Sequence, residues 1–336
     1  MTGADAAPGG ATEAPEGMGT LYVVGIGPGL PHQMTQRARD VIRTADCVIA
    51  SNLYQEFLRE DGTIPPESRT EDVELGEAAV PGEIDTAEDG EAADTAPDGG
   101  VAAVAEAAAE NGWSPGKAAT HPDGETVEIV RSSMGQQIEL AREAFERVRA
   151  GQDVAHVSGG DPNVYGKSDL VYLMADEEDA DDVPIEIVPG VTAALGGAAM
   201  VGAPLSNDFC TVSLSDKWRG WEEIAEKLRA AAVSGFVVVL YNCWRDYERA
   251  VEVLREHRTD DAPVAIVNDA GRGDAGRNLD DETYTLTTLG EATAHDDEVG
   301  GMGTSLIVGT HETEVWENDH GEFLVTPRGG RDVDDF

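Results

Sequence analysis

The feature that most constrains the fold of this chain is a series of short apolar runs that end in turn-forming residues. Each run has four to six residues, a length typical of strands buried on both faces of a sheet. Segments with apolar residues at helical spacing separate the runs. This alternation predicts an α/β fold with a mainly parallel sheet that helices cover on both faces. In the first 190 residues the runs are Leu21–Ile26, Cys47–Ala50, Val154–Ser158 and Ile185–Val188.

The helices expected between these strands are Thr35–Ala45, Ser132–Ala150, a segment from about Lys167, and Val191–Val201. Gly151 follows the second of them directly and is suited to cap it. After Leu205 the alternation starts again, which indicates a second lobe. Its strands are expected at Cys210–Leu214, Phe236–Tyr241, Val264–Val267, Thr283–Leu286 and Ser305–Val308, and its helices at Trp221–Ala232 and from about Asp246 to His257.

Two stretches lack the residues that build a core. Residues 1–18 contain no aromatic residue, Lys or Arg, and Glu71 to Glu110 holds 13 acidic residues and none that is basic or aromatic. Such segments bury too little apolar surface to offset the entropy lost on ordering. The expected organisation is a disordered tail (1–18), an N-terminal αβα lobe (19–202) with a disordered acidic insertion (about 61–125), a C-terminal αβα lobe (203–315) and an acidic tail (316–336).

The composition narrows the possible partners. The chain carries 66 Asp and Glu against 23 Lys and Arg, a formal net charge of −43, which argues against nucleic acid and anionic membranes. A high negative charge with few lysines is expected of a halophilic protein, because concentrated salt screens self-repulsion. Three cysteines without a C-x-x-C pair argue against a disulfide framework or a thiolate metal site. The sequence predicts a soluble cytoplasmic protein without a metal ligand set.

A glycine-rich loop, Gly25–Gly29, follows the first apolar run directly. Glycines permit positive φ and a close approach of a ligand, but their spacing does not match the dinucleotide fingerprint G-x-G-x-x-G. The second run ends in Ser51 and Asn52, so a carboxylate for an adenosine ribose is missing there. A nicotinamide-dependent oxidoreductase is therefore disfavoured, and a tight turn without a ligand stays an alternative for this loop.

Four more loops place small or amide-bearing residues directly after strands, where open α/β sheets bind ligands. In the first, Asp161 has two readings: its carboxylate accepts a hydrogen bond from a ribose hydroxyl, or it shapes the turn. Taken singly, each loop is an ordinary turn, but in this order they form a specific set. They are Ser158–Gly166, Val188–Ala194, Leu240–Asn242 and Val267–Arg272.

These motifs resemble those of the tetrapyrrole methylases, the class III S-adenosylmethionine-dependent methyltransferases. The resemblance rests on Gly25–Gly29, Gly159–Gly166 and Pro189–Ala194 in this order. Other stretches are similar to the branch that methylates C17 of precorrin-3B or cobalt-factor III in cobalamin biosynthesis. They are Ser133–Gln137, Gly202–Phe209, Ser213–Asp216 and Asn268–Arg272. The similarity covers about residues 19–60 and 126–310.

The resemblance implies two αβα lobes, a cofactor S-adenosylmethionine in an active site in the inter-lobe cleft, and usually a homodimer. It also implies C17 methylation coupled to ring contraction. Asn163 and Lys167 depart from the small or apolar residues expected at their positions, and Asp269 stands where the branch usually has Asn. Carried over position by position, the cofactor contacts are Pro28, Gly159, Gly160, Asp161, Val164, Thr192, Ala193, Asn242 and Ala270.

The implied substrate is a polycarboxylate tetrapyrrole, which so acidic a protein binds only where basic side chains gather. Arginine suits this task because its guanidinium group grips a carboxylate through two hydrogen bonds. Ring contraction needs an acid or base, for which Asp216, Tyr54 and His32 are candidates; a helix cap, a core position and a loop position are their respective structural alternatives. The substrate candidates are Arg272 first, then Arg131, Lys217 and Arg245, with Arg37, Arg219 and Lys167 as further basic residues.

Other functions stay open on the sequence alone. A related methylase acting at a different ring carbon, on diphthamide or on ribosomal RNA would carry similar loops, although the acidic composition argues against RNA. A protein that binds corrinoids or the cofactor without catalysis would also look alike.

Overall fold

The computed structural model describes residues 17–65, 117–120, 126–132, 137–217, 219–272 and 282–329. These residues form two compact units. Unit 1 contains the described residues up to Ile26 and from Met34 to Gly190, and unit 2 contains Gly27–Gln33 and those from Val191 onward. Most of the expected N-terminal tail and acidic insertion, and the end of the expected C-terminal tail, lie outside the described residues.

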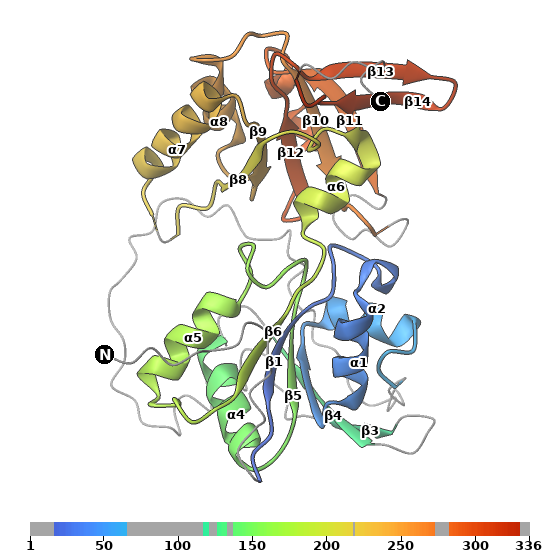
Figure 1. The fold of residues 1–336 in the computed structure, drawn as a ribbon, viewed down its shortest axis with the longest axis vertical. Helices are drawn as coiled ribbons and strands as arrows, with labels where there is room; N and C mark the ends of the chain where they lie inside the picture. Colours follow the sequence, from blue (N-terminus) through green and yellow to red (C-terminus); the bar gives the residue numbers. More distant parts are fainter. Residues whose placement is uncertain are drawn as a thin grey trace. The chain divides into compact units, whose positions relative to one another are not determined.

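Unit 1 is built on a six-stranded sheet in the order β3-β4-β2-β5-β1-β6, coloured blue to yellow-green in Figure 1. Neighbouring strands run parallel except for the antiparallel pair of β3 and β4. All residues of β2 and β5 are buried, as expected for strands covered on both faces. The strands are β1 (Leu21–Gly25), β2 (Cys47–Ala50), β3 (Lys117–Thr120), β4 (Thr126–Arg131), β5 (Val154–Ser158) and β6 (Ile185–Val188).

Two pairs of helices cover the two faces of this sheet, as Figure 1 shows. Val23 of β1 packs in one core cluster with Phe145 and Val171, while its neighbour Val24 packs in the other with Ile42. The alternation of side chains along a strand explains why successive valines serve opposite faces. The helices are α1 (Gln36–Thr44) and α2 (Asn52–Glu60) on one face, and α4 (Gln137–Arg149) and α5 (Ser168–Glu177) on the other.

Unit 2 contains a five-stranded sheet in the order β11-β10-β12-β9-β8. Only β8 and β9 pair in parallel, and the other three pairs are antiparallel. The strands are β8 (Phe209–Ser213), β9 (Val237–Tyr241), β10 (Pro263–Asn268), β11 (Thr283–Thr288) and β12 (Thr304–Val308). The mainly parallel sheet that the sequence predicts is thus confirmed in unit 1, whereas unit 2 is mostly antiparallel.

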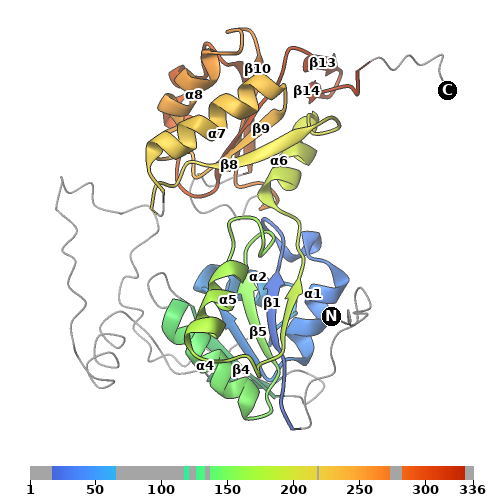
Figure 2. The same ribbon diagram turned by 60° about the vertical axis from the view of Figure 1, so that its left-hand side comes forward.

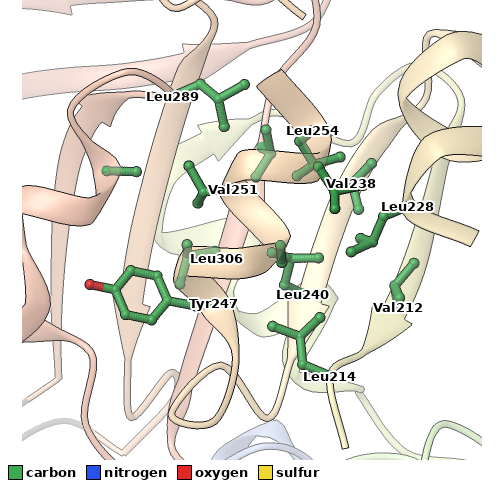
Figure 3. Close-up of a cluster of buried hydrophobic side chains, with 14 of the residues drawn as sticks. Val212, Leu214, Leu228, Val238, Leu240, Tyr247, Val251, Leu254, Leu289 and Leu306 are labelled. Atoms are coloured by element: carbon green, nitrogen blue, oxygen red, sulfur yellow. The ribbon is translucent and has the colours of Figure 1, made fainter. Parts of the chain in front are cut away.

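Helices also cover both faces of the unit 2 sheet. On one face, Leu228 and Leu254 pack with Leu240 and Leu306, the cluster that Figure 3 shows; in Figure 2, α7 and α8 lie side by side here. On the other face, Ala198 of α6 belongs to a second core cluster. The helices are α6 (Ala193–Val201), α7 (Trp221–Ser234) and α8 (Tyr247–Arg255), with the short 3-10 helices η1 (Pro31–Gln33), η3 (Ala292–Ala294) and η4 (Asp296–Glu298).

The division into units differs from the expected boundary between residues 202 and 203. Helix α6 and the loop Gly27–Gln33 fall in unit 2 rather than in the N-terminal lobe. The physical reason is packing, because Ala194, Ala198 and Val201 are buried together with strand residues of the unit 2 sheet. The α/β class and the predicted strands and helices are otherwise confirmed.

The expectation of weak order is wrong for two segments, the described part of the C-terminal tail and the start of the acidic insertion. Glu314–Asn318 (β13), which starts two residues before the expected C-terminal tail, forms a hairpin with Gly321–Val325 (β14) inside it, and β14 also pairs with Gly202–Ala203 (β7). Leu324 is fully buried in a core cluster of unit 2, which accounts for this order. At the start of the expected insertion, Thr63 and Ile64 are fully buried as well. Within the described ranges, none of the helices is both long and apolar enough to span a bilayer.

Candidate functional site

In unit 1, three glycines bring the loops after β1, β5 and β6 into backbone contact. A Cβ atom on Gly190 would lie 2.2 Å from the carbonyl oxygen of Gly160, and one on Gly25 would lie 2.7 Å from the same oxygen. Both distances are too short for any side chain, so only glycine permits this approach. The three loops meet at the carboxyl ends of parallel strands, where α/β sheets bind ligands.

Asp161 joins two of these loops through its carboxylate. Its Oδ1 accepts a hydrogen bond from the backbone N–H of Asn163 (2.8 Å), and its Oδ2 accepts one from the N–H of Gly190 (3.0 Å). The first bond is the Asx turn that the sequence offered as one of two readings. The second fixes the loop after β5 against the loop after β6. A ribose contact of the same carboxylate stays a prediction.

Tyr54 lies against the start of the β5 loop. A Cβ atom on Gly159 would lie 2.0 Å from the phenol oxygen of Tyr54, so the absence of a side chain at 159 makes room for the ring. Ser51 caps α2 by accepting a hydrogen bond from the N–H of Tyr54 (3.5 Å). The position where a nucleotide-binding fold would carry a ribose carboxylate is therefore a helix cap, and Tyr54 also packs partly in the core.

A buried polar cluster lies beneath the same loop. The Lys167 Nζ atom donates to the backbone oxygen of Val157 (3.1 Å) and to Ser132 Oγ (3.3 Å), and lies 3.2 Å from His156 Nε2. Burial lowers the pKa of Lys167 to about 8. Burial and the charge of Lys167 hold the pKa of His156 well below its usual value, so this imidazole is neutral.

In unit 2, the loop Gly27–Gln33 packs against the turn that follows β10. The N–H of Leu30 donates to the backbone oxygen of Gly271 (2.8 Å), and a Cβ atom on Gly29 would lie 2.2 Å from that oxygen. A Cβ atom on Gly196 of α6 would lie 2.7 Å from Pro28 and 3.8 Å from the Ala270 methyl group. The structure thus brings the expected cofactor residues Pro28 and Ala270 to one place.

Thr192 and Ala193 lie at the start of α6, which Tyr241 fixes to the end of β9. The phenol oxygen of Tyr241 accepts a hydrogen bond from the N–H of Ala194 (2.7 Å) and lies 2.6 Å from Thr192 Oγ1. Tyr241 belongs to a motif that the sequence analysis singled out, but its role in positioning these two residues was not predicted.

Tyr241→Phe is expected to lower the unfolding free energy by about 1–3 kcal/mol, because the buried N–H of Ala194 loses its acceptor. Urea denaturation followed by circular dichroism measures this change. Tyr247→Phe is the matched control: it removes a hydroxyl whose partner among the described residues is the carboxylate of Asp296 at 3.2 Å. Equal loss of stability in both variants would contradict a special role of Tyr241.

Asn242 follows Tyr241 and faces the end of β8. Its φ of 58° lies in the left-handed region, which asparagine tolerates better than most residues. Its Nδ2 donates to Ser213 Oγ (2.9 Å), while Arg219 donates to the backbone oxygen of Ser213. The carboxyl ends of β8 and β9 therefore carry an amide and a guanidinium group side by side.

Asp216 and Arg245, expected in different roles, pair with each other at 3.2 Å. The guanidinium carbon of Arg245 also lies 4.4 Å from the centre of the Trp244 ring. Asp216 does not cap the following helix, which starts at Trp221 after Gly220; that alternative is wrong. Both members of the pair are exposed and accessible to a ligand.

Arg272, the first substrate candidate, has its charge compensated within the fold. It forms an ion pair with Asp269, which is 1% exposed and adopts a φ of 48°. Because this guanidinium group already holds a buried carboxylate, it is less available to a second one. In the sequence, Asp269 stands out only because the branch usually has Asn there. Its ion pair with Arg272 is not predicted.

The remaining candidates lie in separate places. His32 is exposed on η1 in unit 2, Arg131 ends β4 in unit 1, Lys217 is exposed after β8, and Val164 donates its N–H to the Asp161 backbone oxygen (3.2 Å). Arg37 pairs with Glu186 at 2.7 Å. The roles of all these residues stay predictions. In the described ranges, no three His, Cys, Asp or Glu side chains gather to hold a metal ion.

Comparison with known proteins finds a matching family and similar relatives. Residues 20–292 match the family Tetrapyrrole (Corrin/Porphyrin) Methylases. A precorrin-3B C(17)-methyltransferase of a Sinorhizobium species is 40% identical over 208 residues, which are 59% of this chain and 78% of the relative. A cobalt-factor III methyltransferase of Priestia megaterium is 28% identical over 319 residues and 93% of this chain. The chain spans only 45% of that relative's length.

Solved structures agree on the fold. The crystal structure of the methyltransferase CobJ superposes with a TM-score of 0.64 at 20% identity, covering 92% of this chain and all of that one. A uroporphyrin-III C-methyl transferase from Thermus thermophilus, complexed with S-adenyl homocysteine, superposes with a TM-score of 0.54 at 22% identity, covering 87% and 97%. Since the family match spans most of the chain and the Sinorhizobium relative is matched over 78% of its length, this chain belongs to the tetrapyrrole (corrin/porphyrin) methylase family.

Proposed function

We propose that this protein is an S-adenosylmethionine-dependent C-methyltransferase of cobalamin biosynthesis that methylates C17 of cobalt-factor III or precorrin-3B. The names of the Sinorhizobium and Priestia relatives support this substrate class. The observation that carries the proposal is the convergence of the loops after β1, β5 and β6 at Gly25, Gly160 and Gly190, with Asp161 fixed among them.

The residues present suit a nucleoside cofactor. Glycines at 25, 160 and 190 let three loops meet at the carboxyl ends of parallel strands, and Asp161 is held by two backbone N–H groups in one orientation. When bound, S-adenosylmethionine supplies an electrophilic methyl group. The protein's part is to hold it in line with the acceptor carbon, an effect worth about 7–11 kcal/mol in favourable cases. The residues proposed to hold it are Gly159, Gly160, Asp161 and Val164 of unit 1, and Pro28, Thr192, Ala193, Asn242 and Ala270 of unit 2.

The substrate's carboxylates are proposed to bind at the basic group after β8 and β9. Arg219 and Arg245 lie there, and Lys217 is exposed in the same segment as Arg219. Asp216 holds Arg245 in place without burying it. Arg219, Arg245 and Lys217 together give this segment the local positive charge that a polycarboxylate requires.

Arg245→Ala is expected to raise KM for the tetrapyrrole about tenfold, the size of one charge-assisted hydrogen bond, with little change in kcat. Initial rates at varied tetrapyrrole and saturating S-adenosylmethionine measure it. Arg229→Ala is the matched control, because Arg229 is half-buried on α7 and pairs with Glu256 at 2.9 Å. An unchanged KM in Arg245→Ala would remove this residue from the substrate site.

The function itself is tested by incubating the protein in molar salt with isotope-labelled S-adenosylmethionine and either cobalt-factor III or precorrin-3B. Mass spectrometry should find one labelled methyl group in the tetrapyrrole, and NMR should place it at C17. A label at another ring carbon would point to a different methylase activity. If the tetrapyrrole carries no label, the remaining alternative is a protein that binds corrinoids or the cofactor without catalysis. Product mass and connectivity also test coupled ring contraction, and sedimentation tests the expected homodimer.

A further inference from the structure

Lys167 occupies a position at which a lysine is physically unfavourable. It precedes the first residue of α5, where the helix dipole disfavours positive charge. Its ammonium group is buried, and in the described part of the chain it has no carboxylate partner. The protein has 66 acidic residues, so this lack of a partner cannot come from a shortage of carboxylates. A buried, unpaired cation costs stability and calls for a compensating role.

The contacts of Lys167 define that role. The loop 159–166 starts after Ser158 and ends before Lys167. The Nζ atom reaches back to the backbone oxygen of Val157, one residue before the end of β5, and to Ser132, which follows β4. One side chain therefore ties the exit of the loop to its entry and to the end of β4, which is the second strand from β5 in the sheet.

Below its pKa of about 8, Lys167 is an ammonium ion. Its three protons match three acceptors: Val157 O, Ser132 Oγ and His156 Nε2. His156 is neutral, and its Nδ1, buried without a partner in the described residues, then carries the imidazole proton. Loss of the Nζ proton removes one of the three donors. His156 is the titratable group in hydrogen-bond contact with Lys167, and it stays neutral across the relevant pH range.

We propose that Lys167 is a positioning residue whose amino group holds the loop 159–166 in its ligand-binding conformation. This inference rests on the proposed function, because it assigns Lys167 to the cofactor contacts Gly159, Gly160, Asp161 and Val164 of that loop. The side chain acts through the loop and not on the reacting atoms. Lys167 therefore distinguishes the proposed cofactor loop of this chain, because the family resemblance implies a small or apolar residue at this position.

The test reads the loop directly by hydrogen exchange in the protein without ligand. The amides of Val164 and Ser168 report on it, since they donate to Asp161 O and Pro162 O at 3.2 Å. At pH 7, Lys167→Met is expected to lower their protection factors about tenfold, the size of one charge-assisted hydrogen bond. In the unchanged protein the same protection should rise between about pH 8 and 10.5, because burial in the closed loop lowers the pKa of Lys167 and opening restores it, and in Lys167→Met it should not depend on pH.

A control variant and the pH dependence separate anchoring from packing. Lys227→Met removes an exposed lysine that pairs with Glu223 at 2.6 Å on α7, and it should leave both reporter amides unchanged. A protection factor in Lys167→Met equal to that of the unchanged protein overturns the proposal. Lower protection in the variant, without a pH dependence in the unchanged protein, assigns the side chain a packing role and also overturns it.

Calorimetry with S-adenosylhomocysteine separates this inference from the proposed function. The unchanged protein should bind it, and Lys167→Met should bind it about tenfold more weakly at pH 7. If the unchanged protein does not bind it while the exchange results are as expected, the loop is anchored by Lys167 and the proposed cofactor is wrong. Equal affinity of both proteins would show that the anchor does not control ligand binding, which overturns the inference.

Discussion

Gly190→Ala is expected to weaken binding of S-adenosylhomocysteine about a hundredfold and to lower the unfolding free energy by about 1–3 kcal/mol. The new methyl group would lie 2.2 Å from the Gly160 oxygen and 2.8 Å from the Gly25 carbonyl carbon, and both are backbone atoms that no rotamer change can move. The loops must separate, which also strains the bond from the Gly190 N–H to Asp161. Calorimetry measures the affinity, and thermal unfolding measures the stability.

Gly19→Ala provides a matched control for this loss. A Cβ atom on Gly19 would lie 2.0 Å from the backbone oxygen of Gln152, so a comparable clash arises at the opposite, amino end of β1. This variant should lose similar stability but keep its affinity for S-adenosylhomocysteine at temperatures where it is folded. If both variants lose affinity equally, the effect comes from global destabilisation and the convergence of the three loops is not the binding site.

The fold was predictable where local patterns carry the information. Buried runs such as Val154–Ser158 predict strands, and amphipathic segments such as Thr35–Ala45 predict helices. Both elements are found close to the expected bounds. Helix α2 does not follow from the apolar runs, because Ser51 and Asn52 directly follow a strand; a serine at that place is nevertheless a typical N-cap. The hairpin of β13 and β14 was missed because its strands are mostly exposed and rich in acidic residues.

The antiparallel pairing in unit 2 could not be predicted from the apolar runs. Pairing direction depends on the length and path of the connections, and a fully buried run such as Ser305–Val308 has the same composition in either orientation. The unit boundary was misplaced for a similar reason. The small residues of α6 are uniformly apolar, so the sequence does not show that Ala194 and Ala198 pack on the unit 2 sheet.

At the candidate site, the sequence identified loops better than it identified contacts. The glycines of the loops after β1, β5 and β6 were recognised by motif, and the structure accounts for them by their backbone contacts. By contrast, the pair of Asp216 with Arg245 and that of Asp269 with Arg272 are tertiary contacts or local turns that no spacing rule reveals. His156 was overlooked because a single histidine in an apolar strand usually fills the core.

The largest effect on stability is expected from Lys167→Met and depends on pH. Burial lowers the pKa of Lys167 from its ordinary value of 10.5 to about 8, so between these values the unfolded chain binds more protons than the folded one. The unfolding free energy of the unchanged protein therefore rises with pH across this window, by about 3 kcal/mol from this group. Below pH 8 the full penalty of the buried charge is present, and methionine removes it at every pH.

The pH dependence of the difference between the two proteins isolates this charge. Loss of the hydrogen bonds to Val157 and Ser132 shifts the stability of Lys167→Met by a constant amount, whereas the charge penalty changes only between about pH 8 and 10.5. Denaturation at pH 7 to 10.5 should thus show the variant gaining most, relative to the unchanged protein, at the low end of this range. A constant difference would mean that Lys167 keeps its ordinary pKa. It would also mean that the loop's anchor is solvated, and a solvated ammonium group would neither strain the fold nor hold the loop.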